Sequence, residues 1–226
     1  MKNKQYEKTF FKYKSLEGES FKYFVQLLLD NKMYAASFKE LNDPMEGFYM
    51  AKDVDKKNRD IIMGNKCSKR IISMVQKEKE EDKPVNMLMW SHYTDGHKGC
   101  CIEFHFIDDN KKVSMINYVD RIDEECKKSQ FNDDDINKFL NRKFVDWEYE
   151  NESRFIGNNK FEEIVIDKIY LGMKIDDIYD IEGSPNEAFY KKLITRLQPE
   201  LEKKIVVMKA EDFINTCSDN ETLRKG

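Results

Sequence analysis

The sequence lacks long hydrophobic runs and any marked excess of charge of one sign. No apolar run approaches the roughly 18 residues that a membrane-spanning helix needs. Lys and Arg number 39 against 43 Asp and Glu, a net charge of −4, so no broad basic surface for duplex DNA is expected. Residues 1–8 are charged without an apolar stretch, so we expect no secretory signal and no membrane association.

Cysteine is also scarce. The chain has five, two of them adjacent at Cys100 and Cys101, and no C-x-x-C spacing occurs. An odd number without that spacing predicts neither a disulfide framework nor a zinc ribbon. We therefore expect reduced, mostly buried thiols in a cytoplasmic protein.

Aromatic and charged residues are abundant instead. They make up 12% and 36% of the 226 residues. Disordered chains are poor in aromatic residues, so this composition predicts a folded protein with a densely charged surface. At this length folding buries roughly 70% of the unfolded chain's surface, enough for a core without disulfides.

The apolar periodicity predicts short strands mixed with helices. Strands are expected over 6–14, 32–38, 100–106, 113–119, 148–156, 161–170 and 203–209. Helices are expected over 17–30, 58–81 (one long helix or one broken at Gly64), 133–145 and 185–197. We expect 113–119 to be the hairpin partner of 100–106, and Asn31 to end the first helix. Ser184 and Pro185 predict a capped start for the last helix.

This pattern predicts an α+β fold in one compact domain over residues 1–226. Its expected parts are an N-terminal strand–helix–strand with an Asn-Asp-Pro loop over 6–49, a helical insertion over 50–84, a sheet core with a C-terminal helix over 85–214, and a frayed tail over 215–226.

The first polar cluster is the segment Asn42-Asp43-Pro44-Met45-Glu46. Such a turn aims short polar side chains and free backbone N–H groups into a cleft. The alternative is a loop that needs these residues only for its own Asx-turn hydrogen bonds.

The second cluster holds all the histidines, His92, His97 and His105, within 14 residues. Histidine suits acid–base chemistry or metal binding. His92 and His97 are five residues apart and match no zinc pattern, so we expect no metal. His92 is then a site residue or a hydrogen-bonded structural one, and His97 lies in a turn.

The third cluster is Trp147–Arg154, with the sequence WEYENESR. If it is extended, Glu148, Glu150, Glu152 and Arg154 point to one side. Carboxylates so close repel unless a cation, a substrate or a shared proton compensates, and enzymes use this to tune acids and bases. The alternative is an exposed strand face on which Arg154 pairs with Glu152 and contributes little.

In this order the clusters resemble the bacterial family called domain of unknown function 2971. The resemblance spans roughly residues 10–172. It rests on five motifs: Phe11-Lys12-Tyr13-Lys14; Asn42–Glu46; Met89–Tyr93 with His97-Lys98-Gly99; Ile102-Glu103-Phe104; and Trp147–Arg154, followed by Gly172.

More distantly, the layout looks like that of the ADP-ribosyltransferase superfamily, which cleaves NAD. That resemblance implies a mixed or antiparallel split sheet flanked by helices, with NAD as the cofactor. It implies that Lys12 or Tyr13 holds NAD, that Tyr34 stacks on the nicotinamide, and that Glu150 or Glu152 is catalytic.

The same resemblance implies that Arg154 holds a phosphate or fixes the glutamates. His92, Asn42 and Asp43 would complete the cleft. The chain departs from the superfamily on the first strand, where Lys-Tyr stands in place of the usual His or Arg.

Three functions follow as hypotheses. The first is a nucleotide-using enzyme that transfers ADP-ribose to an unidentified macromolecule or cleaves NAD, with a toxin or phage-defence role. The second is a nucleotide or nucleic-acid hydrolase that uses His92 with Glu150 and Glu152. The third is a non-enzymatic module whose aromatic residues bind a ligand or partner.

Overall fold

A computed structural model of the protein describes residues 8–43, 45–48, 56–121, 131–177 and 186–214. The predicted tail at 215–226, the predicted cap at Ser184 and Pro185, and Pro44 lie outside these residues. The chain combines helices with mostly antiparallel sheets. No helix in the described ranges has both the length and the apolar character of a membrane span.

Internal contacts divide the chain into two units. Unit 1 comprises residues 1–32, 76–109 and 163–226, and unit 2 comprises residues 33–75 and 110–162.

The sheet of unit 1 has the strand order β10-β9-β4-β1. Its strands are β1 (Phe10–Lys14), β4 (Cys100–Phe106), β9 (Phe161–Leu171, in unit 1 from Glu163 onward) and β10 (Ile205–Val207). β4 is antiparallel to both neighbours, and β10 is parallel to β9. The predicted strand over 100–106 is confirmed.

The predicted hairpin between 100–106 and 113–119 is wrong. β4 is buried at all but one of its positions, which suits a strand with a neighbour on each edge, and it pairs with β1 and β9. Residues 113–115 instead form β5, which pairs within unit 2.

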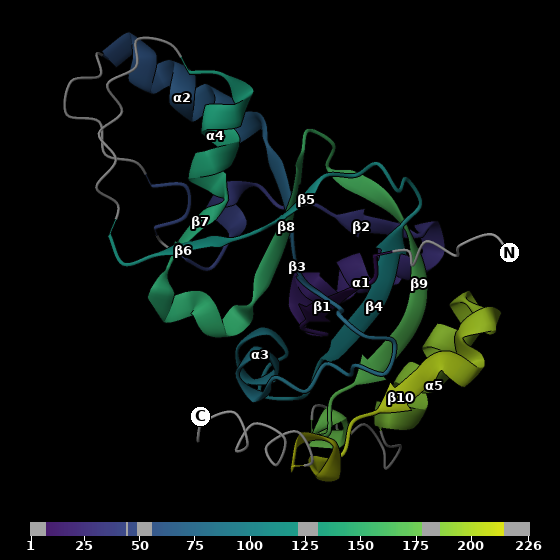
Figure 1. The fold of residues 1–226 in the computed structure, drawn as a ribbon. Helices are drawn as coiled ribbons and strands as arrows, with labels where there is room; N and C mark the ends of the chain where they lie inside the picture. Colours follow the sequence, from purple (N-terminus) through teal and green to yellow (C-terminus); the bar gives the residue numbers. More distant parts are fainter. Residues whose placement is uncertain (1–7, 44, 49–55, 122–130, 178–185, 215–226) are drawn as a thin grey trace, which may run out of the picture. The chain divides into compact units, whose positions relative to one another are not determined.

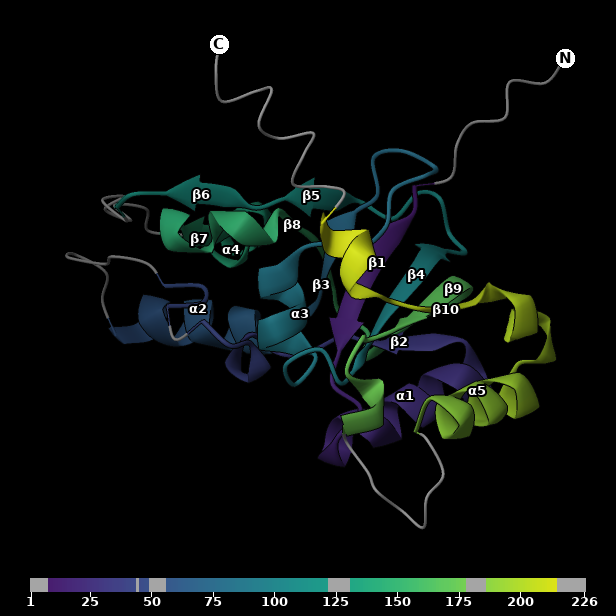
Figure 2. The ribbon, with the colours of Figure 1, turned by 90° about the horizontal axis from the view of Figure 1, so that it is seen from below.

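The helical elements of unit 1 are α1 (Gly18–Asp30), α3 (Met87–Tyr93), η3 (Ile175–Asp177), α5 (Asn186–Leu197) and η4 (Pro199–Lys204). α1 ends as predicted at Asn31, whose left-handed backbone directs its N–H to the Leu27 carbonyl. α5 lies alongside α1 (Figure 2). The ring of Tyr190 on α5 contacts the ring of Phe21 on α1.

In unit 2 the sheet order is β3-β8-β5, and both pairings are antiparallel (Figure 1). These strands are β3 (Arg70–Gln76, in unit 2 up to Val75), β8 (Glu152–Gly157) and β5 (Val113–Met115). A parallel pair joins β6 (Asn117–Val119) to β7 (Arg142–Phe144). The other elements are β2 (Lys32–Tyr34, in unit 2 from Met33), η1 (Phe38–Glu40), α2 (Lys56–Ser68), α4 (Asp133–Leu140) and η2 (Val145–Glu150).

The helix predicted over 58–81 is wrong beyond Ser68. Residues 70–76 form β3, in which the adjacent Ile71 and Ile72 are both buried. Burial of consecutive residues on opposite faces is typical of a strand inside a sheet, and the spacing of these isoleucines had not distinguished it from a helix. The predicted helix over 133–145 likewise ends at Leu140, where β7 follows.

The strand predicted over 148–156 is only partly correct. Residues 145–150 form the 3-10 helix η2, and Asn151 has a left-handed φ of 45°. The extended strand therefore begins at Glu152. The prediction that Glu148 and Glu150 share one strand face with Glu152 and Arg154 is therefore wrong.

The core of unit 2 packs α2 and α4 on one face of this sheet. Ile62 of α2 and Ile136, Phe139 and Leu140 of α4 cluster with Ile71 of β3. Ile71 pairs with Ile156, two residues beyond Arg154 on the same face of β8. The side chain of Arg154 therefore lies on the face of the sheet that α2 and α4 cover.

Candidate functional site

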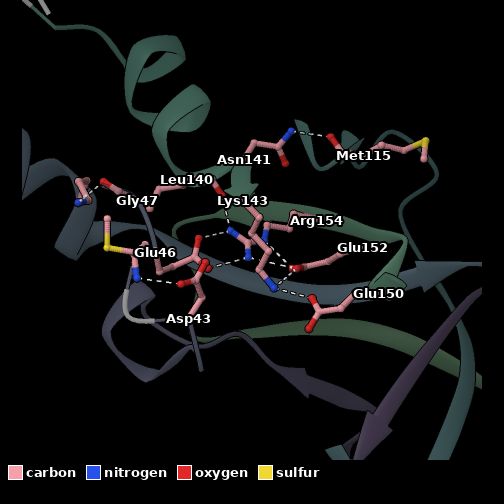
Figure 3. A network of polar contacts seen from close by, with 12 residues as sticks. Asp43, Glu46, Gly47, Met115, Leu140, Asn141, Lys143, Glu150, Glu152 and Arg154 are labelled. Carbon is pink, nitrogen blue, oxygen red and sulfur yellow. Dashed lines mark hydrogen bonds and ion pairs between the residues drawn. The ribbon is translucent and has the colours of Figure 1, made fainter. Parts of the chain in front are cut away.

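Arg154 is the centre of a buried charge network in unit 2 (Figure 3). Its side chain is 1% exposed, yet each of its five N–H groups has an acceptor. Nε and Nη2 donate to the two carboxylate oxygens of Glu152, at 2.5 Å and 3.2 Å. Nη1 and Nη2 donate to the two oxygens of Glu46, and Nη1 also donates to the Leu140 carbonyl.

The sheet and α4 prepare this position. Arg154 lies on the central strand β8, opposite Ser73 of β3 and Ser114 of β5. Directly opposed residues share a face, so the neighbours of Arg154 across the sheet on both sides are small residues. Leu140 is the last residue of α4, where an unpaired carbonyl and the negative end of the helix dipole favour a cation.

Lys143 extends the network from β7. Its ammonium donates to Glu150 at 2.5 Å and lies 2.7 Å from Oε2 of Glu152. Oε2 of Glu152 thus contacts both Arg154 and Lys143. The same ammonium lies 5.1 Å from the centre of the Trp147 ring, so a cation–π contact joins η2 to the network.

These contacts decide which groups stay charged. Burial alone would raise the pKa of Glu152, but the charges and hydrogen bonds of Arg154 and Lys143 outweigh it and hold that pKa at about 2. Burial would lower the pKa of Lys143, and its neighbours Glu152 and Glu150 raise it instead. Arg154 likewise has a raised pKa, because its carboxylate partners outweigh its burial.

The pKa of Glu46 is shifted in the opposite direction to that of Glu152, although both carboxylates contact the same guanidinium. Burial raises the pKa of Glu46, and the hydrogen bonds and charge of Arg154 offset only part of that effect. Two carboxyl groups whose environments move their pKa values apart are the arrangement that enzymes use for acid and base roles.

Aromatic side chains border the carboxylates. Trp147 and Tyr149 of η2 are half-buried, with ring centres 6.2 Å apart. Tyr118 of β6 is also half-buried, and its hydroxyl accepts a hydrogen bond from the backbone N–H of Glu152 at 2.8 Å. Burial and Glu150 raise the pKa of Tyr149, so its hydroxyl stays protonated at neutral pH.

The structure joins three of the predicted site residues, Glu150, Glu152 and Arg154, in this one network. The alternative interpretation, in which Arg154 and Glu152 form an exposed, weak pair, is wrong. The pair is buried, where breaking it is costly.

Three other predicted site residues, Tyr34, Asn42 and Asp43, also belong to unit 2. Asp43 is buried and accepts a hydrogen bond from the Met45 N–H at 2.8 Å, which is the Asx turn that the alternative interpretation described. Asn42 is exposed. The Tyr34 hydroxyl donates to Glu40 at 2.7 Å, and its ring contacts Phe161 edge-on.

Lys12, Tyr13 and His92 belong to unit 1. Tyr13 is buried, and its ring meets the fully buried Trp90 at right angles, 5.5 Å between centres, which is core packing. Lys12 is half-buried on β1, and His92 is exposed in the last turn of α3.

The remaining histidines are also in unit 1. His97 lies in a turn with φ of 73°, and its ring stacks on Trp90. Nδ1 of His105 lies 2.9 Å from Asp167. Across the described ranges, no group of three or more His, Cys, Asp and Glu is arranged to hold a metal ion.

Sequence reasoning missed Glu46 and Lys143 as site residues. Glu46 was visible as the last residue of the Asn-Asp-Pro motif, which was itself singled out. Lys143 carried no signal, because it stands beside Arg142 in a chain already rich in lysine, and only its burial on β7 distinguishes it.

Comparison of the chain with protein-family models, with curated proteins and with solved structures found no significant match.

Proposed function

We propose that this protein is an enzyme that cleaves the bond between nicotinamide and ribose in NAD, passing ADP-ribose to a macromolecule or to water. One observation carries the proposal. Two hydrogen bonds join Arg154 to Glu46. They connect the Trp147–Arg154 motif to the Asn42–Glu46 motif, and the sequence predicts that these two motifs belong to one site.

The charge of the network supports this chemistry. Its members are two cations, Arg154 and Lys143, and three carboxylates, Glu46, Glu150 and Glu152. The nicotinamide of NAD is a cation, and the ribosyl carbon becomes more positive as that bond breaks. A preorganised carboxylate in a poorly solvated site stabilises such a charge far better than water does.

We assign contact with the ribose to Glu150. Glu152 is bonded through both oxygens to Arg154, and one of these oxygens also contacts Lys143, so it acts as a positioning residue. Glu150 ends η2 next to the half-buried Tyr149 and close to Trp147, whose rings attract a planar cation. Glu150 is 2% exposed, so substrate entry requires η2 to move, and a short 3-10 helix suits such a movement.

The test is nicotinamide release from NAD by the purified protein, alone and with cell lysate as a source of acceptor. We expect release by the wild type and none by Glu150→Gln. Glu148→Gln is the matched control, because Glu148 is an exposed glutamate of the same 3-10 helix. No release in either setting, with NAD also failing to shift the melting temperature, would overturn the proposal.

One observation favours a second candidate, a non-enzymatic binding module. Every N–H group of Arg154 is already bonded within the chain, as expected of a network that holds unit 2 together. In that case Glu150→Gln and Glu152→Gln lower the melting temperature sharply, and neither the wild type nor any variant releases nicotinamide. Hydrolysis that uses His92 with the glutamates stays a prediction without such an observation.

A further inference from the structure

Unit 1 carries a hollow of about 440 Å³ that the proposed function does not use. It is lined by Lys191, Lys192, Thr195, Arg196, Glu202 and Ile205. The first four belong to α5, Glu202 to η4, and Ile205 begins β10. Its volume lies within the range of sites that bind small molecules, roughly 300 to 1,000 Å³.

The polar side chains on α5 are spaced to act together. Lys192, Thr195 and Arg196 stand at positions i, i+3 and i+4, which places them on one helix face. Lys192 and Arg196 are exposed. Lys191 forms an ion pair with Glu187 at 2.5 Å, which compensates part of its charge. The face therefore offers an ammonium, a guanidinium and a hydroxyl, the donors that bind phosphate oxygens.

Buried contacts hold these elements in place. Ile194 of α5 and Leu201 of η4 are essentially unexposed. Between them, the side-chain amide of Gln198 donates to the Leu28 carbonyl at 2.6 Å and to Asn31 at 3.0 Å, which fixes the α5–η4 junction to the end of α1. The backbone that carries the donors is therefore fixed, so binding requires no rearrangement of the main chain.

We infer that this hollow binds the diphosphate of a small nucleotide, at a site whose residues are separate from those of the proposed NAD chemistry. Lys192, Thr195 and Arg196 bind the phosphate oxygens. Ile205 supplies an apolar wall for the nucleoside, and the Glu202 carboxylate accepts a hydrogen bond from a ribose hydroxyl or a base amino group.

The charges around the hollow favour a small nucleotide over a nucleic-acid strand. Three cations and one carboxylate line it, which gives a local positive charge, but the whole chain carries −4. Binding along a phosphate backbone needs an extended basic surface. A compact basic hollow with a carboxylate on one wall instead fits one diphosphate and its nucleoside.

The test is calorimetric titration of the full chain with ADP, with inorganic pyrophosphate and with adenosine at one fixed ionic strength. We expect ADP and pyrophosphate to bind to one saturable site and adenosine to bind at least about tenfold more weakly, because the charge-assisted contacts to phosphate are lost. The double variant Lys192→Gln/Arg196→Gln should weaken ADP binding by about tenfold or more.

The matched control is Lys203→Gln/Lys204→Gln, which removes the same charge from exposed residues of η4 that do not line the hollow. ADP affinity should change less than about twofold in this control, as expected for screened surface charges. Equal weakening in both double variants, or no ADP binding by the wild type, would overturn the inference. So would tighter binding of a single-stranded oligonucleotide than of ADP.

The outcome is separable from that of the proposed function. Glu150→Gln lies in unit 2 and should retain ADP binding whether or not the wild type releases nicotinamide.

Discussion

Arg154 and Glu46 stand 108 residues apart in the sequence, and two hydrogen bonds join the guanidinium of one to the carboxylate of the other. Their side chains are 1% and 3% exposed. The contact fastens the turn at residues 45–47 to the central strand β8 of unit 2. Since the guanidinium also holds Glu152, one side chain fixes two carboxylates whose own charges repel.

Arg154→Met should therefore destabilise unit 2 strongly. It leaves Glu46 and Glu152 buried without their main partner, and breaking a buried pair in this way costs roughly 3–5 kcal/mol. Arg154→Lys keeps the charge but supplies three donors in place of five. Its unfolding free energy should therefore lie between those of the wild type and Arg154→Met. Urea denaturation measures both, and a loss below about 1 kcal/mol for Arg154→Met would contradict the network's role.

Acid should weaken the fold through Glu152. Its pKa is about 2 in the folded chain against an ordinary 4.5, so its contribution is complete above pH 4.5 and is lost as pH falls toward 2. The difference corresponds to roughly 3 kcal/mol of unfolding free energy. Glu46 acts in the opposite direction: its raised pKa favours the fold below pH 4.5, and that contribution is lost as pH rises through the raised value.

Chemical denaturation at a series of pH values tests this. The unfolding free energy of Glu152→Gln should depend less on pH between 4.5 and 2 than that of the wild type, whereas Glu148→Gln should follow the wild type. Parallel curves for all three proteins would remove Glu152 as the cause.

Unit 1 contains a buried ion pair of its own, between Lys77 and Glu103. The Lys77 ammonium lies 2.8 Å from Glu103, both side chains are at most 7% exposed, and the Tyr170 hydroxyl donates to Glu103 at 2.7 Å. Lys77→Met leaves the carboxylate without its cation and should cost about 3 kcal/mol or more. Lys77→Met/Glu103→Gln removes the charge as well and should recover part of that loss.

The control is an exposed ion pair, between Lys22 and Glu19 of α1. Lys22 and Glu19 approach to 4.0 Å with side chains 78% and 84% exposed, and Lys22→Met should change the unfolding free energy by less than about 0.5 kcal/mol. If the double variant is no more stable than Lys77→Met, the charge of Glu103 is not what destabilises the single variant.

Gly172 marks a close approach of two backbone segments. A Cβ atom there would lie 2.1 Å from the carbonyl oxygen of His97, so Gly172→Ala forces the backbone apart and should destabilise by several kcal/mol, on the order of other overpacked sites. Gly64 lies inside α2 with open space around it, and Gly64→Ala should stabilise by about 0.5–1 kcal/mol. Thermal melting of both variants checks the opposite signs.

The sequence predicted elements well where the signal was local and strong. α1 shows helical spacing over more than three turns and ends at Asn31 as expected, and β4 lies over the predicted residues. Prediction from the sequence failed where a few apolar residues fit both the helical and the strand periodicity. Ile71 and Ile72 were assigned to a helix because no local feature showed that a sheet would bury both faces of that segment.

Within the candidate site, the sequence by itself determined which segments supply most of the charge network. It singled out the segment that contains Glu46 for its turn residues, and the segment that contains Glu150, Glu152 and Arg154 for its closely spaced carboxylates. Tertiary structure alone decided the partners. η2 turns Glu150 off the strand that holds Glu152, and β7 brings in Lys143. The physical reason is that an ion pair depends on distances of a few ångströms, which chain folding sets between residues far apart in sequence.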